Sequence, residues 1–175
     1  MLDFMVIALP RSGTTWVSNW LTSDKVHCIH DPLAVHRYNE LDNIKSDKVL
    51  GISCTAIFTY KDYLKKHPAK KLILHRDIDE INTSLVSAGM SGIIHSSWQY
   101  ILDDIEGLHI PWTDLFNHPK EIYEYLTGLP FDEERYIELR QMHIEPYLTN
   151  VSYKPKVLGE LLEHYRRISC QSVGV

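Results

Sequence analysis

The run from Val6 to Trp16 reads VIALPRSGTTW and constrains the fold of this chain more than any other segment. It begins as an apolar strand, passes through a loop containing Pro, Arg, Ser and Gly, and continues into a helix. The first backbone N–H groups of a helix have no partners inside it, so they point together at an anion over the loop. Because Gly13 lets the backbone approach closely, the segment predicts a phosphate-binding turn.

This loop lacks the lysine of nucleoside triphosphatases. In the register of G-x-x-x-x-G-K-[ST], Ala8 replaces the first Gly, Gly13 is the second, and Thr14 and Thr15 take the last two positions. The missing Lys reaches the β- and γ-phosphates, and the hydroxyl after it holds magnesium, so Thr14 argues against ordinary ATP or GTP hydrolysis. Arg11 supplies a cation one turn earlier.

Apolar strands alternate with helices along most of the chain. Strands are expected at about 3–9, 25–30, 48–54, 71–75 and 107–112, and helices at about 14–22, 60–67, 78–89 and 91–105, with further helices after them. Such alternation indicates a parallel sheet. We therefore expect an α/β, three-layer P-loop fold, with a central parallel sheet of about five strands flanked by helices and a helical C-terminal region. With 175 residues and 44% apolar content, one domain over 1–175 is predicted.

Charge and cysteine content narrow the class of protein. A net charge of −5 argues against a general nucleic-acid or anionic-membrane surface. Cys28, Cys54 and Cys170 are scattered and odd in number, which predicts neither a disulfide framework nor a zinc site, and the ten histidines are dispersed. The chain starts directly in a strand and has no long apolar run. These features lead us to expect a cytoplasmic protein, a monomer or homodimer, that binds no nucleic acid, membrane or metal.

The loop LPRSGTTW resembles the 5′-phosphosulfate loop of the sulfotransferases, which use 3′-phosphoadenosine 5′-phosphosulfate as donor. A second segment, KLILHRD, ends a strand at Arg76, and Ser84 follows eight residues later, as in the pair with which this family holds the 3′-phosphate of the donor. The resemblance implies that the donor is bound by Arg11, Ser12, Gly13, Thr14, Thr15, Trp16, Arg76 and Ser84. For Trp16, a place in the core is the alternative.

A looser similarity to the family covers residues 108–130. It consists of LHIPWTDL, then His118-Pro119, a helix, and LTGLP. We interpret this stretch as scaffold, in which Asp114 caps a helix and Gly128 ends the next one.

The catalytic base is less directly indicated. Cytosolic sulfotransferases place a His at the end of the strand before Arg76, but residues 53–55 are Ser, Cys and Thr. Carbohydrate sulfotransferases tend to have Glu-Pro after the second strand, and this chain has Asp31-Pro32 there. Asp31 is the preferred base, His30 is the alternative, and at most one should face the crevice because neighbouring strand residues point to opposite faces. A cap of the turn before Pro32 is the other reading of Asp31.

The resemblance implies in-line transfer of a sulfuryl group to a hydroxyl or amine, leaving adenosine 3′,5′-bisphosphate and requiring no metal. Arg11 would stabilise charge on the leaving oxygen, and the acceptor would be a small molecule or saccharide. Two alternatives stay open: a P-loop nucleotide or small-molecule kinase, and a non-catalytic nucleotide-binding domain.

The C-terminal region departs from the family. The glycine-rich basic segment with which cytosolic members cover the donor has no match, and Tyr153-Lys154-Pro155-Lys156 is basic without glycines. A helix at about 156–167 is expected to pack on the domain or on a second subunit, through an apolar face formed by Val157, Leu158, Leu161, Leu162 and Tyr165.

Overall fold

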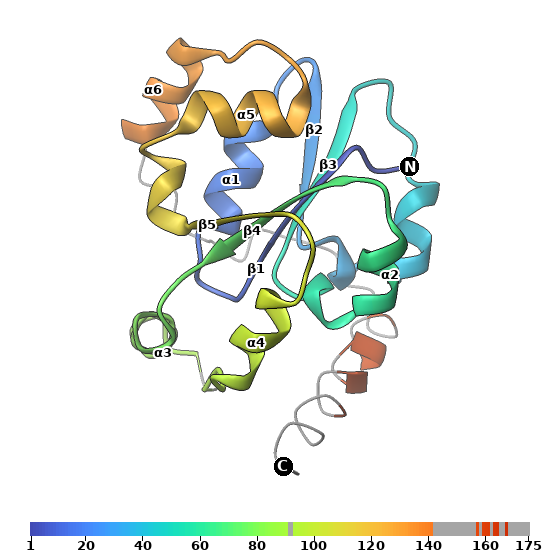
Figure 1. Ribbon diagram of the computed structural model, residues 1–175, viewed down its shortest axis with the longest axis vertical. Helices are drawn as coiled ribbons and strands as arrows, with labels where there is room; N and C mark the ends of the chain where they lie inside the picture. The colour runs from blue at the N-terminus through green and yellow to red at the C-terminus, as the bar shows by residue number, and fades with distance from the viewer. Residues whose placement is uncertain (91–92, 142–156, 158, 162, 165–166, 168–175) are drawn as a thin grey trace.

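The computed structural model describes residues 1–90, 93–141, 157, 159–161, 163–164 and 167. Its centre is a five-stranded, wholly parallel sheet (Figure 1) with the order β2-β3-β1-β4-β5. The strands are β1 (Phe4–Ala8), β2 (Val26–His30), β3 (Val49–Cys54), β4 (Lys70–His75) and β5 (Leu108–Pro111). The sheet confirms the predicted α/β class with a central parallel sheet of five strands, and each strand lies within about two residues of its expected bounds.

Helices cover both faces of the sheet. Packed against one face are α1 (Thr14–Leu21), α5 (Pro119–Thr127) and α6 (Glu133–Gln141), which lie together in Figure 1. The other face carries α2 (Lys61–Lys66), α3 (Ile78–Ser87) and α4 (Ser97–Asp103). Four short 3-10 helices also occur in the described part of the chain: η1 (Pro32–Ala34), η2 (Tyr38–Asn43), η3 (Ile57–Thr59) and η4 (Trp112–Leu115). The described residues between 157 and 167 are helical, as expected for this segment.

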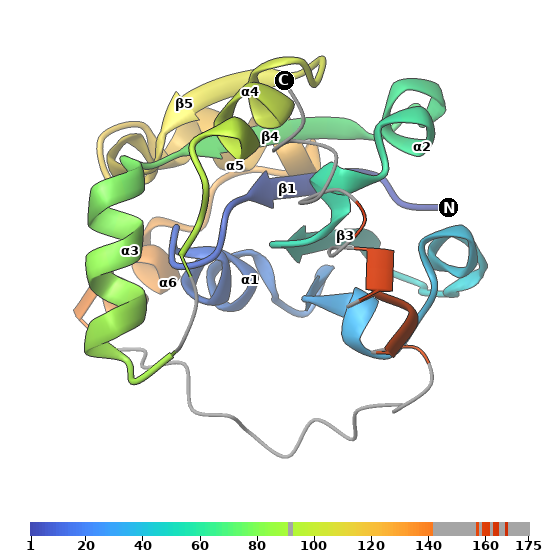
Figure 2. The same cartoon turned by 90° about the horizontal axis from the view of Figure 1, so that it is seen from below.

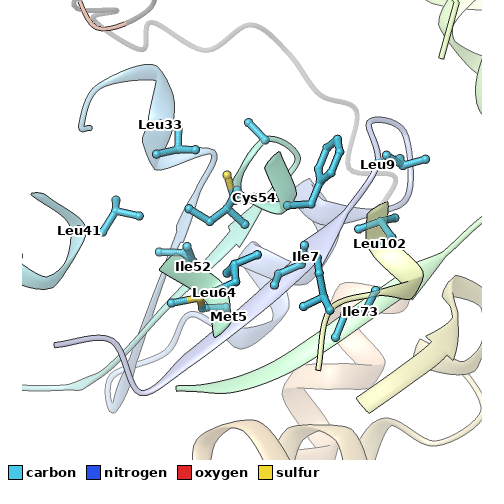
Figure 3. Close-up of a cluster of buried hydrophobic side chains, with 14 of the residues drawn as sticks. Met5, Ile7, Leu9, Leu33, Leu41, Ile52, Cys54, Leu64, Ile73 and Leu102 are labelled. Carbon is cyan, nitrogen blue, oxygen red and sulfur yellow. The ribbon is translucent and has the colours of Figure 1, made fainter. Parts of the chain in front are cut away.

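The central strand β1 shows why this sequence buries a sheet on both faces. All five of its residues are buried, and their side chains alternate between two hydrophobic clusters. Phe4 and Val6 join the cluster beneath α1 and α5, whereas Met5 and Ile7 join the opposite cluster, shown in Figure 3. A strand buried on both sides reads as a continuous apolar run, which is the pattern seen in the sequence.

Two details differ from the expectation. The helix predicted at 91–105 begins at Ser97, while residues 91–92 lie outside the described part of the chain. Asp114 caps no helix: it lies inside η4, and its backbone oxygen accepts a hydrogen bond from the N–H of His118, which is the residue that precedes α5. Gly128 does end α5, with φ of 69° in the left-handed region, as predicted.

The described C-terminal residues pack on the domain. Val157 is buried, and Leu161 contacts the cluster beneath α2. These two positions agree with the predicted apolar face, whereas Leu158, Leu162, Tyr165 and residues 153–156 lie outside the described residues. Within the part of the chain that was searched, no helix has the length and hydropathy needed to cross a bilayer.

Candidate nucleotide site

The turn between β1 and α1 has the backbone of an anion cradle. Gly13 caps α1 with φ of 82°, and Arg11 has φ of 62°, so two residues of the turn adopt the left-handed conformation. For Arg11, which has a Cβ, this conformation costs on the order of 1 kcal/mol or more. No side chain caps the first N–H groups of α1, and its first turn contains no acidic residue. These N–H groups are therefore oriented to bind an anion.

A buried hydroxyl at this turn lacks a hydrogen-bond partner. Ser12 is fully buried, and its Oγ is one of two buried side-chain polar atoms without a partner in the described residues. An unpaired buried hydroxyl costs about 1–3 kcal/mol. Because buried polar groups are usually hydrogen-bonded, this hydroxyl is available to pair with a bound ligand. Ser53, at the end of β3, supports the same turn by donating a hydrogen bond of 2.9 Å to the carbonyl oxygen of Thr14.

Arg76 lies directly beside the turn. Strands β1 and β4 are neighbours, and Ala8 pairs with Leu74, so the segments that leave these two strands run side by side. Nη1 of Arg76 donates a hydrogen bond to the backbone carbonyl oxygen of Arg11. The guanidinium also lies 4.7 Å from the ring centre of Trp112, and its Nε pairs with Glu80 at 3.1 Å. A stacked and tethered guanidinium has few orientations, which suits bidentate binding of a phosphate.

Ser84, in α3, completes this group of side chains. Its Oγ accepts a hydrogen bond of 3.0 Å from Nε of Arg11. The guanidinium of Arg11 therefore lies toward α3, on the same side of the turn as Arg76. Arg11, Ser84 and Arg76 are thus connected by hydrogen bonds, although they come from three separate segments of the chain.

His30 stands at the other side of the turn. Its Nε2 lies 3.3 Å from Oγ1 of Thr14 and 3.2 Å from Oγ1 of Thr15. Both hydroxyls belong to the first turn of α1, where the 5′ end of the predicted donor would lie. The imidazole of His30 is exposed at the end of β2 and is accessible to a ligand there.

Asp31 is held by Thr55 and faces His30. Its Oδ1 accepts hydrogen bonds from the backbone N–H of Thr55, at 2.7 Å, and from Oγ1 of Thr55, at 3.0 Å. Its Oδ2 lies 3.4 Å from Nε2 of His30. Although Asp31 precedes η1, its side chain makes no capping hydrogen bond, so the interpretation as a cap is wrong.

The expectation that His30 and Asp31 point to opposite faces is also wrong. The alternation of side chains holds only within a strand, and β2 ends at His30. Asp31 has φ of 41°, in the left-handed region, which turns the chain and brings the carboxylate beside the imidazole. Thr55 was not predicted as a site residue, although it is one of the three residues, 53–55, among which a His was sought.

Trp16 lies in an aromatic cluster. Its ring centre is 5.3 Å from that of Trp20, 5.1 Å from that of Phe116 and 6.0 Å from that of Tyr136. This packing accounts for the residue without a ligand and favours the core interpretation over nucleotide binding.

Cys54 is fully buried, so it ends a strand without lining the crevice, and burial raises the pKa of its thiol. Among the described residues, no three His, Cys, Asp or Glu side chains are grouped closely enough to hold a metal ion.

No protein-family model matches the chain, and no curated sequence matches it.

Proposed function

We propose that this protein is a sulfotransferase that binds 3′-phosphoadenosine 5′-phosphosulfate and transfers its sulfuryl group to a hydroxyl or amine. The observation that carries the proposal is the hydrogen bond from Arg76 to the turn that ends in Gly13. A nucleotide with phosphates on both its 3′ and 5′ positions needs two anion sites close together. The turn and Arg76 provide two such sites, joined through Arg11 and Ser84.

The 5′ end of the donor is assigned to the turn. The first N–H groups of α1 and the hydroxyl of Ser12 would bind the 5′-phosphate, and the hydroxyls of Thr14 and Thr15 lie in the same helical turn. The 3′-phosphate is assigned to Arg76 and Ser84, with Arg11 between the two ends. In this arrangement Arg11 can act on either end, and we retain for it the stabilisation of charge on the leaving oxygen.

The proposed reaction is a single displacement at sulfur. The acceptor oxygen or nitrogen forms a bond to sulfur while the bond from sulfur to the oxygen of the 5′-phosphate breaks. The acceptor loses a proton to the pair formed by Asp31 and His30, which lies next to the hydroxyls of Thr14 and Thr15. Thr55 fixes one oxygen of Asp31 and so directs the other toward His30.

Ligand-dependent thermal stability tests this assignment against its alternatives. The protein is heated alone, with adenosine 3′,5′-bisphosphate, and with ATP plus magnesium. A ligand that binds the folded state raises the melting temperature in proportion to the logarithm of its concentration. We expect the larger shift with the bisphosphate. A larger shift with ATP plus magnesium would favour the kinase, and a bisphosphate shift without sulfuryl transfer to any of a panel of hydroxyl and amine acceptors would favour a binding domain.

A further inference from the structure

The guanidinium of Arg76 is paired with a carboxylate from the helix that follows it. Its Nε donates a hydrogen bond of 3.1 Å to Oε2 of Glu80, in the first turn of α3, and the two side chains form an ion pair. Figure 2 shows α3 beside the turn that joins β1 to α1, where Nη1 of Arg76 donates to the carbonyl oxygen of Arg11. Among the described residues, Nη2 of Arg76 has no hydrogen-bond partner. A phosphate at this guanidinium would therefore bind Nη2 while Glu80 holds Nε.

The start of α3 offers a phosphate no other attraction. Asp77, Asp79 and Glu80 follow Arg76 directly, and all three are exposed. Asp77 caps α3 by accepting hydrogen bonds from the backbone N–H groups of Asp79, at 2.9 Å, and of Glu80, at 3.0 Å. These two N–H groups are therefore already satisfied. A 3′-phosphate at this place depends on side chains, and Glu80 is the carboxylate that contacts its main cation.

The pair of Arg76 and Glu80 is weak enough to be shared with a ligand. The side chain of Glu80 is 56% exposed, and an exposed ion pair contributes little because water and salt screen it. The side chain of Arg76 is only 20% exposed, and its guanidinium stacks on Trp112. Loss of the negative charge at Glu80 should therefore leave the guanidinium in place, whereas its presence opposes a phosphate that binds the same group.

We infer that Glu80 is a specificity-determining residue of the nucleotide site, whose carboxylate limits the strength with which Arg76 binds the 3′-phosphate. Its charge would thereby favour release of the bisphosphate product. This inference rests on the proposed function, which assigns the 3′-phosphate to Arg76. At a separation of about 5 Å in water, one unit charge changes the affinity for another by about fourfold. A phosphate monoester carries up to about two charges and salt reduces the effect, so removal of the carboxylate should tighten binding about three- to tenfold.

Glu80→Gln tests the inference, because the glutamine oxygen can still accept the hydrogen bond from Nε of Arg76 while the charge is lost. Calorimetry with the full chain measures the affinities for adenosine 3′,5′-bisphosphate and adenosine 5′-monophosphate at about 0.05 M and about 0.5 M sodium chloride. At the lower salt concentration we expect the variant to bind the bisphosphate about three- to tenfold more tightly than the unmodified protein does, and the monophosphate equally. Most of the gain should disappear at the higher concentration. Unchanged or weaker binding of the bisphosphate to Glu80→Gln would overturn the inference.

Asp79→Asn is the matched control. Asp79 is exposed in the same turn of α3, but in the described part of the chain its carboxylate forms no hydrogen bond or ion pair with Arg76. Its removal should change the affinity for the bisphosphate by less than about twofold. Equal gains in both variants would mean that the general charge of the turn opposes the nucleotide, and the inference would be wrong.

The same measurements separate this inference from the proposed function. If the unmodified protein binds the two nucleotides with equal affinity, the assignment of the 3′-phosphate to Arg76 is contradicted, and the proposed function fails together with the inference. If the unmodified protein prefers the bisphosphate and Glu80→Gln does not increase that preference, only the inference is wrong.

Discussion

Arg76 donates a hydrogen bond from Nη1 to the backbone carbonyl oxygen of Arg11, although 65 residues separate them along the chain. This contact brings a strand-end guanidinium to the turn that precedes α1. It exists because β1 and β4 are adjacent and in register, so the segments that leave them emerge at the same edge of the sheet. The proposed two-phosphate site is a direct consequence of this strand order.

Alanine substitutions of two glycines test whether the turn between β1 and α1 binds an anion. Gly13→Ala and Gly128→Ala both place a side chain in the left-handed region, and each should lower the free energy of unfolding by about 1–2 kcal/mol. Only Gly13→Ala should also weaken binding of adenosine 3′,5′-bisphosphate, because only Gly13 lies at the start of α1. Urea denaturation and calorimetry measure the two effects. Equal bisphosphate affinity in both variants would argue against an anion site at the turn.

Two tryptophans should behave differently when replaced. Trp16→Leu disrupts the aromatic cluster with Trp20 and Phe116 and should cost about 2–4 kcal/mol of stability, with little change in bisphosphate affinity. Trp112→Leu removes the ring that stacks on the guanidinium of Arg76 and should weaken the bisphosphate with a smaller loss of stability. Denaturation and calorimetry on both variants check this. A weakened bisphosphate in Trp16→Leu at unchanged stability would return Trp16 to the nucleotide site.

The proposed base can be tested separately from the donor site. Asp31→Asn should lower the turnover of sulfuryl transfer by about 10²–10⁴-fold while leaving bisphosphate affinity unchanged, because the carboxylate is placed to accept a proton and not to bind a phosphate.

Two substitutions of Thr55 test whether its hydroxyl positions the carboxylate of Asp31. Thr55→Val removes the hydroxyl that holds Oδ1 of Asp31, whereas Thr55→Ser keeps it. Turnover should fall in the first variant and be nearly retained in the second. If Thr55→Val reduces stability but not the rate at a temperature where it is folded, Thr55 does not position the base.

The stability of the protein should fall in mild acid because of His75. Burial, followed by the neighbouring His109, holds the pKa of His75 below its ordinary value of 6.5. The unfolded chain therefore binds a proton at this residue below pH 6.5 that the folded protein does not bind, so the contribution is complete above pH 6.5 and is lost as the pH falls toward the lowered pKa. Urea denaturation between pH 7.5 and 5.5 should show this loss. His75→Asn should reduce the dependence of the free energy of unfolding on pH, and an unchanged dependence would contradict this account.

Much of the fold was predictable from the sequence because its signals are local. An apolar strand followed by a Gly turn and a helix specifies β1 and α1 without knowledge of the rest of the chain. The alternation of later strands and helices likewise predicts a parallel sheet. The start of α4 was predicted too early, although Ser96, its N-cap, is of a residue type that is preferred there; its side chain makes no capping hydrogen bond.

The sequence suggests candidate site residues by their type, but it does not predict the contacts between them. The resemblance to the sulfotransferases pairs Arg76 with Ser84, but the orientation of Arg11 toward Ser84 depends on how α3 packs over the turn. Thr55 could not be inferred, since its hydrogen bonds to Asp31 depend on the parallel pairing of β2 with β3 and on the left-handed backbone of Asp31. Such contacts between segments follow from register, which single-sequence patterns do not contain.

The central claim is that one nucleotide bridges the turn and Arg76, and calorimetry with two nucleotides tests it most directly. Adenosine 3′,5′-bisphosphate and adenosine 5′-monophosphate differ only in the 3′-phosphate, which we assign to Arg76. In the unmodified protein the bisphosphate should bind about 10–100-fold more tightly, and Arg76→Ala should remove that difference while leaving the monophosphate affinity nearly unchanged. Equal affinities of the two nucleotides in the unmodified protein, or an undiminished difference in Arg76→Ala, would contradict the account.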